Sequence, residues 1–600
     1  MKNILSLRSI IIAALFGALL AAPLSAGAAP FSSPVSGDAN HVPGEVLVKF
    51  KPATSANART ATVANQGHSV LAGLDRTGWA RVKIGAGQTV AESLAAYRND
   101  PNVEYAQPNY IYHIAAVPVD TQYGQLWAFK NTGQTVTSGT YLPNTGTAGD
   151  DMNIEKAWDI ITDCSSVVVA VVDSGVNYNQ EDLSANMWSS VTYTLHGYNY
   201  VDNNNDPMDR HGHGTHVAGI IGAAGNNATG STGVCWKASI MAVRALDATG
   251  SGTTASIISA INFAVTNGAK VINMSIGGGG AFDQAYSDAI ANAQTNDVVV
   301  VVAAGNSNAN NDSGTTPTYP CNFSQANLVC VAALDQNYAL ASFSNYGTTS
   351  VDVGAPGTNI LSAWAGSKTV ITDDFSTGWT MTGWSTGSLW VNSVLYPFLL
   401  DPSNFPNGTY SNNADDRAYK PFNLSGNDVA VLNFYAQAAV FADDSFNIKY
   451  RSTVGDPFSS GVFLDSLNGT TGGVIVPFSY DLSPCISTTC SVGFQLLTNG
   501  SNVDQGVGIL AFSINTLALN NTSYNTISGT SMASPEVAGL AAMLRAYNPQ
   551  YTYTDVVNSI KKGGRSAASL SGKTTTGKAV DVMSSLAYIN APTGLSATVH

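Results

Sequence analysis

Three residues in this sequence have neighbours that suit covalent hydrolysis. Asp173 directly follows an apolar run at 167–172, His213 lies between two glycines, and Ser531 begins an apolar segment. Covalent hydrolysis of an acyl bond needs a nucleophile, a base that takes its proton, and a carboxylate that holds the base in the right tautomer. Serine, histidine and aspartate perform these roles, so we predict that Asp173, His213 and Ser531 form a catalytic triad.

The elements expected around these residues would gather them at one edge of a sheet. The run 167–172 is continuously apolar, which is typical of a strand buried on both faces of a parallel sheet. Asp173 would then stand at the carboxyl end of that strand, where α/β sheets build their sites. His213 would project from the first turn of one helix, and a second helix beginning at Ser531 would direct its free N–H groups toward a developing oxyanion.

Two other kinds of hydrolase are alternatives. His211, His213 and His216 have a spacing that also suits zinc, which predicts a zinc metallohydrolase. Such an enzyme usually has an acidic residue before the last histidine, where this chain has Thr215. The nucleophile elbow of α/β-hydrolases requires glycine at position 533, which is alanine here. A catalytically idle protein that binds a surface with the same scaffold is an alternative from another class.

Segments typical of strands and helices alternate from residue 125 to residue 367 and again after residue 524. This alternation predicts an α/β domain with a doubly wound, mostly parallel sheet flanked by helices. Helices are expected at 255–265, 281–293, 531–547 and 553–561, and strands at 270–276 and 298–303.

A different pattern separates these two parts. From residue 368 to residue 521 the helical periodicity disappears, and Gly, Asn, Ser and Thr separate short strand-like runs, which predicts an inserted β-sandwich. The chain would leave the α/β sheet near Trp364 and return at Tyr524, so we expect the two ends of the insert to be adjacent. A shorter region at 43–113 mixes strand-like and helix-like runs and predicts a small α+β domain.

The first residues predict export. Lys2 and Arg8 accompany an apolar run at 10–20, and small residues at 26–28 follow, as in a secretory signal cleaved after Ala28. The apolar run is shorter than the ~20 residues of a membrane span, so we expect a secreted, extracellular protein without a membrane partner. The net charge is −14, and the acidic residues are distributed along the sequence rather than clustered in one segment. The sequence has no cluster of basic residues, so we expect no nucleic-acid partner.

The chain contains six cysteines, which allow fifteen disulfide pairings. Two pairs are close in sequence and would close small loops. The remaining two cysteines each precede an apolar, strand-like run, so neighbouring parallel strands would bring them together. Thiolate metal ligands are the alternative, but no C-x₂-C pair occurs, and export favours disulfides. The expected pairs are Cys164–Cys235, Cys321–Cys330 and Cys485–Cys490.

The three motifs together resemble those of the subtilisin-like (subtilase) serine proteases. They occur in the order Asp, His, Ser on an α/β pattern, and this order separates them from chymotrypsin-like enzymes and α/β-hydrolases. The likeness covers residues 125–367 and 524–587. It implies a parallel sheet flanked by helices and a serine endopeptidase that hydrolyses peptide bonds in proteins through an acyl-enzyme.

The resemblance extends to residues that would contact substrate. Asn306 ends an Ala-Ala-Gly-Asn segment that matches the family's oxyanion hole, where its side-chain N–H would stabilise the tetrahedral intermediate. The segment 275–277 resembles the edge strand that pairs with the substrate backbone. The loop 307–319 would wall the pocket for the residue before the cut, and since it carries Asp312 but no Glu, we expect uncharged or apolar side chains there. The substrate-binding residues implied are Ser275, Ile276, Gly277 and Thr318.

Calcium is the cofactor that the resemblance implies, in a structural role and with no catalytic cofactor. One site would use an aspartate that follows the catalytic one, together with amide and carbonyl oxygens of a loop. A second acidic run resembles a further site in some relatives and is equally typical of a polar turn. Hard oxygen ligands of this kind suit Ca²⁺. The first set is Asp182, Asn227, Thr229 and Ser231, and the second is Asp202, Asn204 and Asp206.

The region 43–113 resembles the propeptide of these enzymes through its segments 43–50 and 103–110. Such a propeptide assists folding and blocks the cleft until it is cut off, so the resemblance implies a self-processing proenzyme. The partners implied are protein or peptide substrates and the propeptide, and the enzyme is expected to be a monomer. The expected order is a signal peptide at 1–28, the propeptide at 29–116, the protease domain at 117–367 and 522–590, the inserted β-sandwich at 368–521, and a linker or the start of a fibronectin type III-like module at 591–600.

Overall fold

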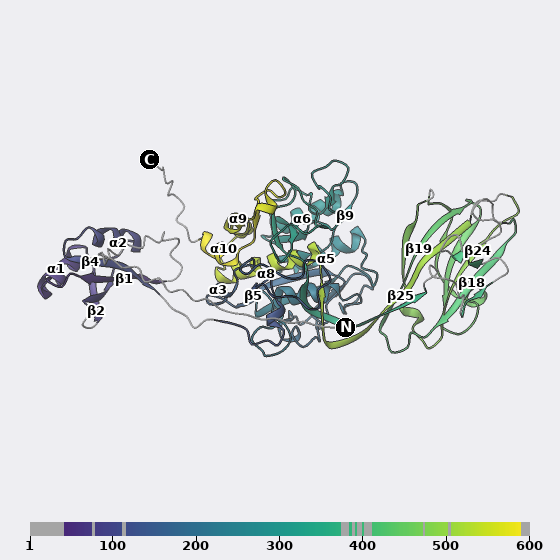
Figure 1. Cartoon of the computed structure of the whole chain (residues 1–600), viewed down its shortest axis with the longest axis horizontal. Coiled ribbons are helices and arrows are strands. Elements are labelled where there is room, and N and C mark those ends of the chain that lie inside the picture. The colour runs from purple at the N-terminus through teal and green to yellow at the C-terminus, as the bar shows by residue number, and fades with distance from the viewer. Residues whose placement is uncertain are drawn as a thin grey trace, which may run out of the picture. The chain divides into compact units, whose positions relative to one another are not determined.

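The computed structural model describes residues 41–74, 78–110, 116–373, 383–386, 391–392, 399–400, 411–471, 474–501 and 506–589 (Figure 1). The predicted signal peptide at 1–28 and the segment at 591–600 lie outside these residues. Among the residues that the structure describes, no helix combines the length and the apolar composition needed to cross a membrane.

The first part is a small α+β domain, as predicted. Its elements are β1 (His41–Phe50), α1 (Ala56–Asn65), β2 (Ser69–Leu74), β3 (Trp79–Lys83), α2 (Val90–Arg98) and β4 (Val103–Tyr110). The strands form an antiparallel sheet in the order β2-β3-β1-β4, and Leu94 and Tyr97 of α2 are buried in its core. Helix α2 begins at Val90 because Thr89 and Glu92 form a reciprocal capping box at its first turn.

The second part is an α/β domain built on a nine-stranded sheet. The strand order is β26-β27-β13-β12-β10-β8-β5-β7-β6, and the pairs are parallel except β26–β27. Its elements are α3 (Glu155–Trp158), β5 (Asp163–Asp173), β6 (Gly197–Asn199), α4 (His213–Gly222), β7 (Lys237–Arg244), α5 (Thr254–Thr266), β8 (Val271–Met274), β9 (Gly278–Gly279), α6 (Gln284–Thr295), β10 (Val299–Ala303), β11 (Thr318–Tyr319), β12 (Leu328–Leu334), β13 (Val353–Pro356), α8 (Thr530–Tyr547), α9 (Tyr553–Gly563), β26 (Arg565–Ser566), β27 (Lys578–Ala579) and α10 (Val582–Ile589).

Helices cover both faces of this sheet. Successive side chains of a strand point to opposite faces. Val169 and Val171 of β5 therefore pack into the core that contains α4 and α8, whereas Ala170 and Val172 pack into the core that contains α5 and α6. Strand β5 is thus buried on both faces, as its continuous apolar run predicted. The expected doubly wound, mostly parallel sheet is confirmed.

The inserted part is a β-sandwich, as predicted. Two antiparallel sheets enclose a core that includes Phe434, Phe446, Phe494 and Phe512. The elements are β14 (Ile360–Asp373), β15 (Ser385–Thr386), β16 (Val391–Asn392), β17 (Leu399–Leu400), β18 (Asp415–Phe422), β19 (Val429–Val440), β20 (Ser445–Arg451), α7 (Pro457–Ser460), β21 (Val462–Leu467), β22 (Gly469–Thr470), β23 (Val476–Asp481), β24 (Cys490–Leu497) and β25 (Gly506–Ile527).

A two-stranded antiparallel ribbon of β14 and β25 joins the sandwich to the α/β domain (Figure 1). The two strands pair along the whole length of β14, with one irregularity beside Trp364. Ala363 lies opposite Tyr524, so the two ends of the insert are adjacent, as its position in the sequence required. Both strands run without interruption across the predicted domain boundaries at 367/368 and 521/522. The boundaries therefore fall inside elements rather than between them.

The six cysteines form three disulfides in the structure. One of them joins β5 to the segment just before β7, and these two strands are parallel neighbours. The other two close loops of short sequence separation. The pairs are Cys164–Cys235, Cys321–Cys330 and Cys485–Cys490.

Helix α8 carries an acidic side chain into the core of the α/β domain. Glu536 is 0% exposed, and neither of its carboxyl oxygens has a hydrogen-bond partner in the described part of the chain. Burial raises the pKa of this carboxyl well above its ordinary value. In the unfolded chain the same group ionises in its usual range, so the folded chain binds one more proton over the pH interval between the two pKa values.

Replacing Glu536 by Gln should therefore stabilise the protein at neutral and alkaline pH. The wild type loses up to about 1.4 kcal/mol of unfolding free energy per pH unit as the pH rises through that interval, and a neutral amide removes this loss. We expect equal stability of the two proteins near pH 4 and a growing advantage of the variant above it, measured by denaturant unfolding. Glu155→Gln, at a half-buried ion pair with Lys130, is the control. If the unfolding free energies of the wild type and Glu536→Gln change in the same way with pH, the prediction is wrong.

Candidate active site

The carboxyl ends of three adjacent strands place predicted site residues at one edge of the sheet. Asp173 is the last residue of β5, Ser275 directly follows β8, and Asn306 follows β10 after a short turn. Strands β10, β8 and β5 are neighbours in the sheet, with β7 on the other side of β5. From β5 the chain forms β6 and β7 on one side and then crosses to β8 on the other side of β5, so the strand order reverses here. Ligand sites of α/β sheets lie at such switch points.

His213 is the first residue of α4 and contacts Asp173. Its Nδ1 lies 2.7 Å from Oδ1 of Asp173, whose side chain is completely buried. Because a carboxylate accepts, Nδ1 carries the proton and Nε2 is left as the basic nitrogen. Burial lowers the pKa of His213, but the carboxylates of Asp173 and Asp209 together raise it by more, and the pKa ends above its ordinary value. The histidine is thus held in the tautomer that a general base requires.

Gly212 permits this start of α4. It has a φ of +100°, which favours glycine, and a Cβ at this position would lie 2.4 Å from the ring of Trp364. Trp364 also packs edge-on against His216 of the same helix. Strand β14 therefore packs, through Trp364, directly against the turn that carries His213.

Ser531 is the second residue of α8 and lines the same cleft as His213. The cleft has a volume of about 770 Å³. Ser531 donates its hydroxyl to the carbonyl of Ser275 at 3.1 Å, and the hydroxyl of Ser275 donates to the Ser531 carbonyl at 2.8 Å. These two bonds fix the start of α8 against the end of β8, with the unpaired N–H groups of the helix at the nucleophile. The structure thus brings His213 and Ser531 to one cleft, with the buried Asp173 in contact with His213.

Asn306 also lines this cleft, and its amide has a defined orientation. The N–H and the hydroxyl of Thr530 both donate to Oδ1 of Asn306 at 2.9 Å. Two donors at one end require an oxygen there, so Nδ2 is the free end of the amide. Thr530 directly precedes Ser531, which places this donor beside the nucleophile. The arrangement fits an oxyanion-hole donor.

Of the residues predicted to bind substrate, Thr318 alone does not line the cleft. Ile276 and Gly277 line the cleft, as does the backbone around Ser275. Thr318 is buried and donates its hydroxyl to Asn311 at 3.1 Å. Its neighbour Tyr319, which the sequence did not single out, lines the cleft instead. Alternation along the short strand β11 explains this, since adjacent side chains point to opposite faces.

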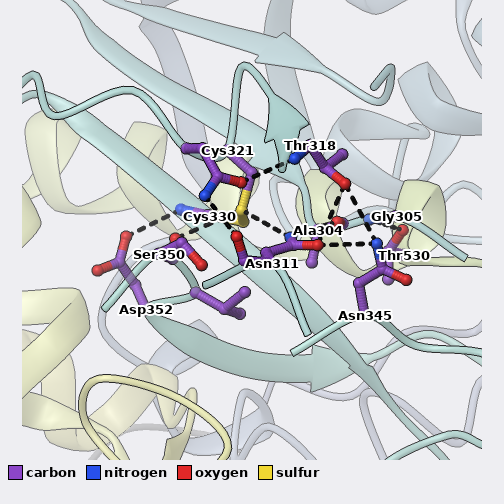
Figure 2. The surroundings of a disulfide bond; sticks show 12 residues. Ala304, Gly305, Asn311, Thr318, Cys321, Cys330, Asn345, Ser350, Asp352 and Thr530 are labelled. Atoms are coloured by element: carbon purple, nitrogen blue, oxygen red, sulfur yellow. Dashed lines mark hydrogen bonds between the residues drawn. A yellow bond between two sulfur atoms is a disulfide. The ribbon is translucent and has the colours of Figure 1, made fainter. Parts of the chain in front are cut away.

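A disulfide and two buried asparagines support the loop 305–319 (Figure 2). Cys321–Cys330 ties the segment after β11 to β12. Asn345 donates its amide to Asn311 at 2.9 Å, and Asn311 donates in turn to the backbone carbonyl just beyond β10. These bonds join the loop to the sheet that carries the catalytic edge.

Asp312 binds this loop to a neighbouring segment of the chain. Its carboxylate accepts hydrogen bonds from hydroxyl and N–H groups of residues 348–350. Burial alone would raise its pKa, but these donors, Ser350 and Thr349 foremost, lower the pKa to about 2. The ionised carboxylate thus holds the loop against residues 348–350.

The zinc alternative is not favoured by the geometry of the histidines. His213 engages Asp173, and Nε2 of His216 is bound to the carbonyls of Ile360 and Asn525 at 3.0 and 3.1 Å. Burial lowers the pKa of His216 to about 3, so it is a neutral donor within the core. Within the described ranges no group of three or more His, Cys, Asp or Glu side chains is arranged to hold a metal ion.

The first predicted calcium set surrounds a buried carboxylate. Asp182 is 0% exposed and accepts from the Asn227 amide, the Ser231 N–H and the Tyr524 hydroxyl. Burial raises the pKa of Asp182, and the nearby charge of Asp120 adds to this effect, although the three donors oppose it. Two buried carboxylates that repel each other are a setting that fits a divalent cation with hard oxygen ligands. The predicted carbonyls belong to Thr229 and Ser231 of the same loop.

Sequence reasoning missed Asp120 in this set. Its carboxylate accepts from the N–H groups of Asn226 and Asn227 at 2.7 and 2.9 Å, which places it against the same loop. No motif surrounds Asp120 in the sequence, and it lies far from the loop along the chain. The only local signal is an aspartate near the predicted start of the protease domain.

The second predicted calcium set has separate partners in the structure. Asp202 forms an ion pair with Arg244 at 2.7 Å, and Asp206 accepts from the hydroxyl of Tyr178 at 3.1 Å. Asn204 Oδ1 accepts from the N–H of Asp206 at 2.9 Å, which is typical of a polar turn. The second site stays a prediction.

Two family models match this chain. The model described as the subtilase family matches residues 165–388 and 426–574. The model described as the fervidolysin N-terminal prodomain matches residues 27–109. The first match contains Asp173, His213 and Ser531, and its gap at residues 389–425 lies within the insert.

Individual relatives are similar over part of this chain. A thermophilic serine proteinase of Bacillus sp. strain AK1 is 38% identical over 332 residues, which cover 55% of this chain and 73% of the relative. Thermitase of Thermoactinomyces vulgaris is 42% identical over 209 residues, which cover 35% of this chain and 69% of the relative. An extracellular protease of Xanthomonas campestris is 35% identical over 313 residues, which cover 46% of this chain and 48% of the relative.

Proposed function

Because the chain belongs to the subtilase family, it is a serine endopeptidase with an N-terminal prodomain, and we propose that it is secreted and removes this prodomain itself. The proposed catalytic residues are Asp173, His213 and Ser531. The observation that carries this assignment is the 2.7 Å contact between His213 and Asp173 in the cleft that Ser531 also lines.

In the proposed reaction, Oγ of Ser531 attacks the carbonyl carbon of the peptide bond, and its proton passes to Nε2 of His213. Asp173 accepts the Nδ1–H of His213 and stabilises the imidazolium. The substrate oxygen becomes an oxyanion, to which Asn306 donates its Nδ2–H. The C–N bond then breaks as His213 gives its proton to the leaving amine, and water hydrolyses the acyl-enzyme by the same route.

The proposed substrates are proteins and peptides in extended conformation. The backbone around Ser275–Gly277 lines the cleft and would pair with a substrate strand, so recognition would rest mainly on main-chain hydrogen bonds. The carboxylate of Asp312 is occupied by residues 348–350. We therefore propose that the pocket for the residue before the cut takes uncharged or apolar side chains.

We also propose that the enzyme acts outside the cell and that the prodomain inhibits it before maturation. A relative from Xanthomonas campestris is named an extracellular protease, which supports action outside the cell. The small α+β domain, whose core includes Val46 and Tyr97, would block the cleft until it is cut off. The mature enzyme is proposed to act as a monomer.

An inhibitor comparison tests the proposed function. Casein hydrolysis by the purified enzyme should be blocked by a serine-directed sulfonyl fluoride, which reacts with an activated serine hydroxyl. A chelator that strips zinc should not block it in the presence of calcium. The opposite pattern would favour the zinc alternative, and no hydrolysis in any condition would favour a catalytically idle binding protein.

We also propose that Ca²⁺ binds beside Asp182 and stabilises the fold. Asp120, Asp182 and the Asn227 amide would hold it together with carbonyls of the loop at Thr229 and Ser231. The ion would supply positive charge to the buried carboxylates and take no part in the chemistry.

Chelation should accordingly lower the melting temperature of the enzyme. A ligand that binds only the folded state adds RT ln(1 + [L]/Kd), which is about 4 kcal/mol at a thousandfold excess over Kd. We expect Asp182→Ala to remove most of the difference between calcium and chelator in calorimetry of the inhibited enzyme. Asp206→Ala tests the second predicted site in the same way. A melting curve of the wild type that calcium does not move would count against both sites.

A further inference from the structure

A second buried aspartate lies behind the catalytic histidine. Asp209 is 0% exposed and accepts five hydrogen bonds of 2.6–2.9 Å. It forms no ion pair within the part of the chain that the structure describes, so neutral donors alone surround it. The removal of a carboxylate from water is costly, and such a group is usually retained for a role. The donors are the Ser174 hydroxyl, the N–H groups of His211 and Gly212, and the N–H and hydroxyl of Thr215.

The hydrogen bonds of Asp209 join the two elements that carry catalytic residues. Ser174 directly follows Asp173 at the end of β5, and it donates its hydroxyl to Asp209 at 2.9 Å. The same hydroxyl oxygen accepts from the N–H of Gly214 at 3.0 Å. Gly214 directly follows His213 at the start of α4. A continuous chain of bonds therefore runs from the strand end of Asp173 to the first turn of the His213 helix.

We propose that Asp209 is a positioning residue for the reaction, which holds the His213 turn at hydrogen-bonding distance from Asp173 through Ser174 and the start of α4. Its negative charge also stabilises His213 in the protonated form that arises during the reaction. This inference rests on the proposed catalytic function of Asp173, His213 and Ser531.

The charge of Asp209 acts on His213 together with a small set of neighbours. Burial lowers the pKa of His213, the carboxylates of Asp173 and Asp209 raise it, and the ammonium of Lys368 lowers it. The ring of His211 lies 6.2 Å away, and burial lowers its own pKa, so it adds little positive charge. Without Asp209, the pKa of His213 would be lower. The titratable or charged groups around His213 are Asp173, Asp209, His211, His216 and Lys368.

The test compares Asp209→Asn with the wild type in the hydrolysis of a small chromogenic peptide across pH, with rates per titrated active site. The amide keeps the shape of the side chain but loses the charge and places an N–H₂ group among donors. We expect kcat to fall on the order of 10²-fold, as for an Ångström-scale misplacement of a catalytic group, while KM hardly changes. The acidic limb of kcat/KM should move to lower pH. A structural role alone would not move that limb.

Asp352→Asn is the matched control. Asp352 is also buried, forms an ion pair with Lys561 and accepts from the N–H of Cys330 at 2.9 Å, just before β13. Its replacement should lower stability and leave the acidic limb in place. An Asp209→Asn enzyme with the kcat and the acidic limb of the wild type would overturn the proposal. If wild-type activity resists serine-directed inhibitors, the proposed function itself fails, which is a distinguishable result.

Ser174→Ala carries the test if Asp209→Asn does not fold. This variant removes the hydroxyl that donates to Asp209 and accepts from the N–H of Gly214, and it leaves the charge of Asp209 in place. We expect kcat to fall roughly tenfold with an unmoved acidic limb, because only the alignment of His213 changes. A Ser174→Ala enzyme with the kcat of the wild type would overturn the positioning role.

Discussion

Replacement of Ser531 by Ala should abolish hydrolysis of casein and of small peptides. Without Oγ no acyl-enzyme forms, and loss of a triad nucleophile in a subtilisin lowers kcat by a factor on the order of 10⁶. The variant should also accumulate as a longer chain that retains residues 43–113, since the proposed maturation is self-cleavage. Gel mobility and N-terminal sequencing of the secreted product measure this, beside activity assays of the purified protein.

The matched control is Ser528→Ala, three residues earlier in the same motif. Ser528 is exposed, and its hydroxyl accepts one hydrogen bond from the N–H of Asn359. We expect that variant to mature and to hydrolyse casein. A second control adds active wild-type enzyme to the Ser531→Ala protein, which should trim the prodomain and show that the variant is folded. Normal activity of Ser531→Ala would refute the assignment of the nucleophile, and maturation without activity would refute self-cleavage alone.

The α/β domain was predictable because its signals are local. Residues 167–172 of β5 are a continuous run of valines and alanine, which is typical of a strand buried on both faces. Helix α8 has apolar residues almost throughout, and it is buried almost throughout as well. In both elements a single segment of the chain specifies its own conformation and environment. The edge on which Asp173 and Ser275 meet then follows from the general rule for parallel sheets.

Parts of the prodomain and of the ribbon were less predictable. Helix α1 at Ala56–Asn65 has a weak apolar face with only Thr62 and Val63 buried, so its sequence carries little helical periodicity. The six residues of β2 are all exposed, and an exposed strand shows no alternation. The predicted boundaries of the insert fall within β14 and β25, because a continuous ribbon has no change of composition where one domain passes into the next.

Side chains that act through distant partners could not be found from sequence. Thr318 and Tyr319 are adjacent, and only the pairing of β11 with β9 decides which one faces the cleft. Asp120 reaches a loop more than a hundred residues away. Asp209 shortly precedes His213 in the sequence, but its contact with Ser174 depends on how α4 meets β5. Sequence motifs specify residue types at a site, whereas their supports depend on tertiary packing.

Replacement of Asn306 by Ala should lower kcat by two to three orders of magnitude while KM stays nearly constant. One oxyanion-hole donor in a subtilisin is worth about 2.7–4 kcal/mol of transition-state stabilisation. The donor acts on charge that exists only in the transition state, so its loss affects kcat rather than substrate binding. Steady-state kinetics on a small peptide substrate measure both constants, and the maturation of the variant should be correspondingly slow.

Thr530→Val separates the orientation of the Asn306 amide from its presence. The substitution removes the hydroxyl that donates to Oδ1 of Asn306 at 2.9 Å but keeps the N–H bond to the same oxygen. Because one of two restraints remains, we expect kcat to fall by less than in Asn306→Ala, again with little change in KM. Because the Thr530 hydroxyl oxygen also accepts from the N–H of Gly305 at 3.1 Å, we expect the double variant to be slower than Asn306→Ala by the small factor that this second bond contributes. A KM effect that exceeds the kcat effect in Asn306→Ala would show instead that Asn306 binds the substrate in its ground state.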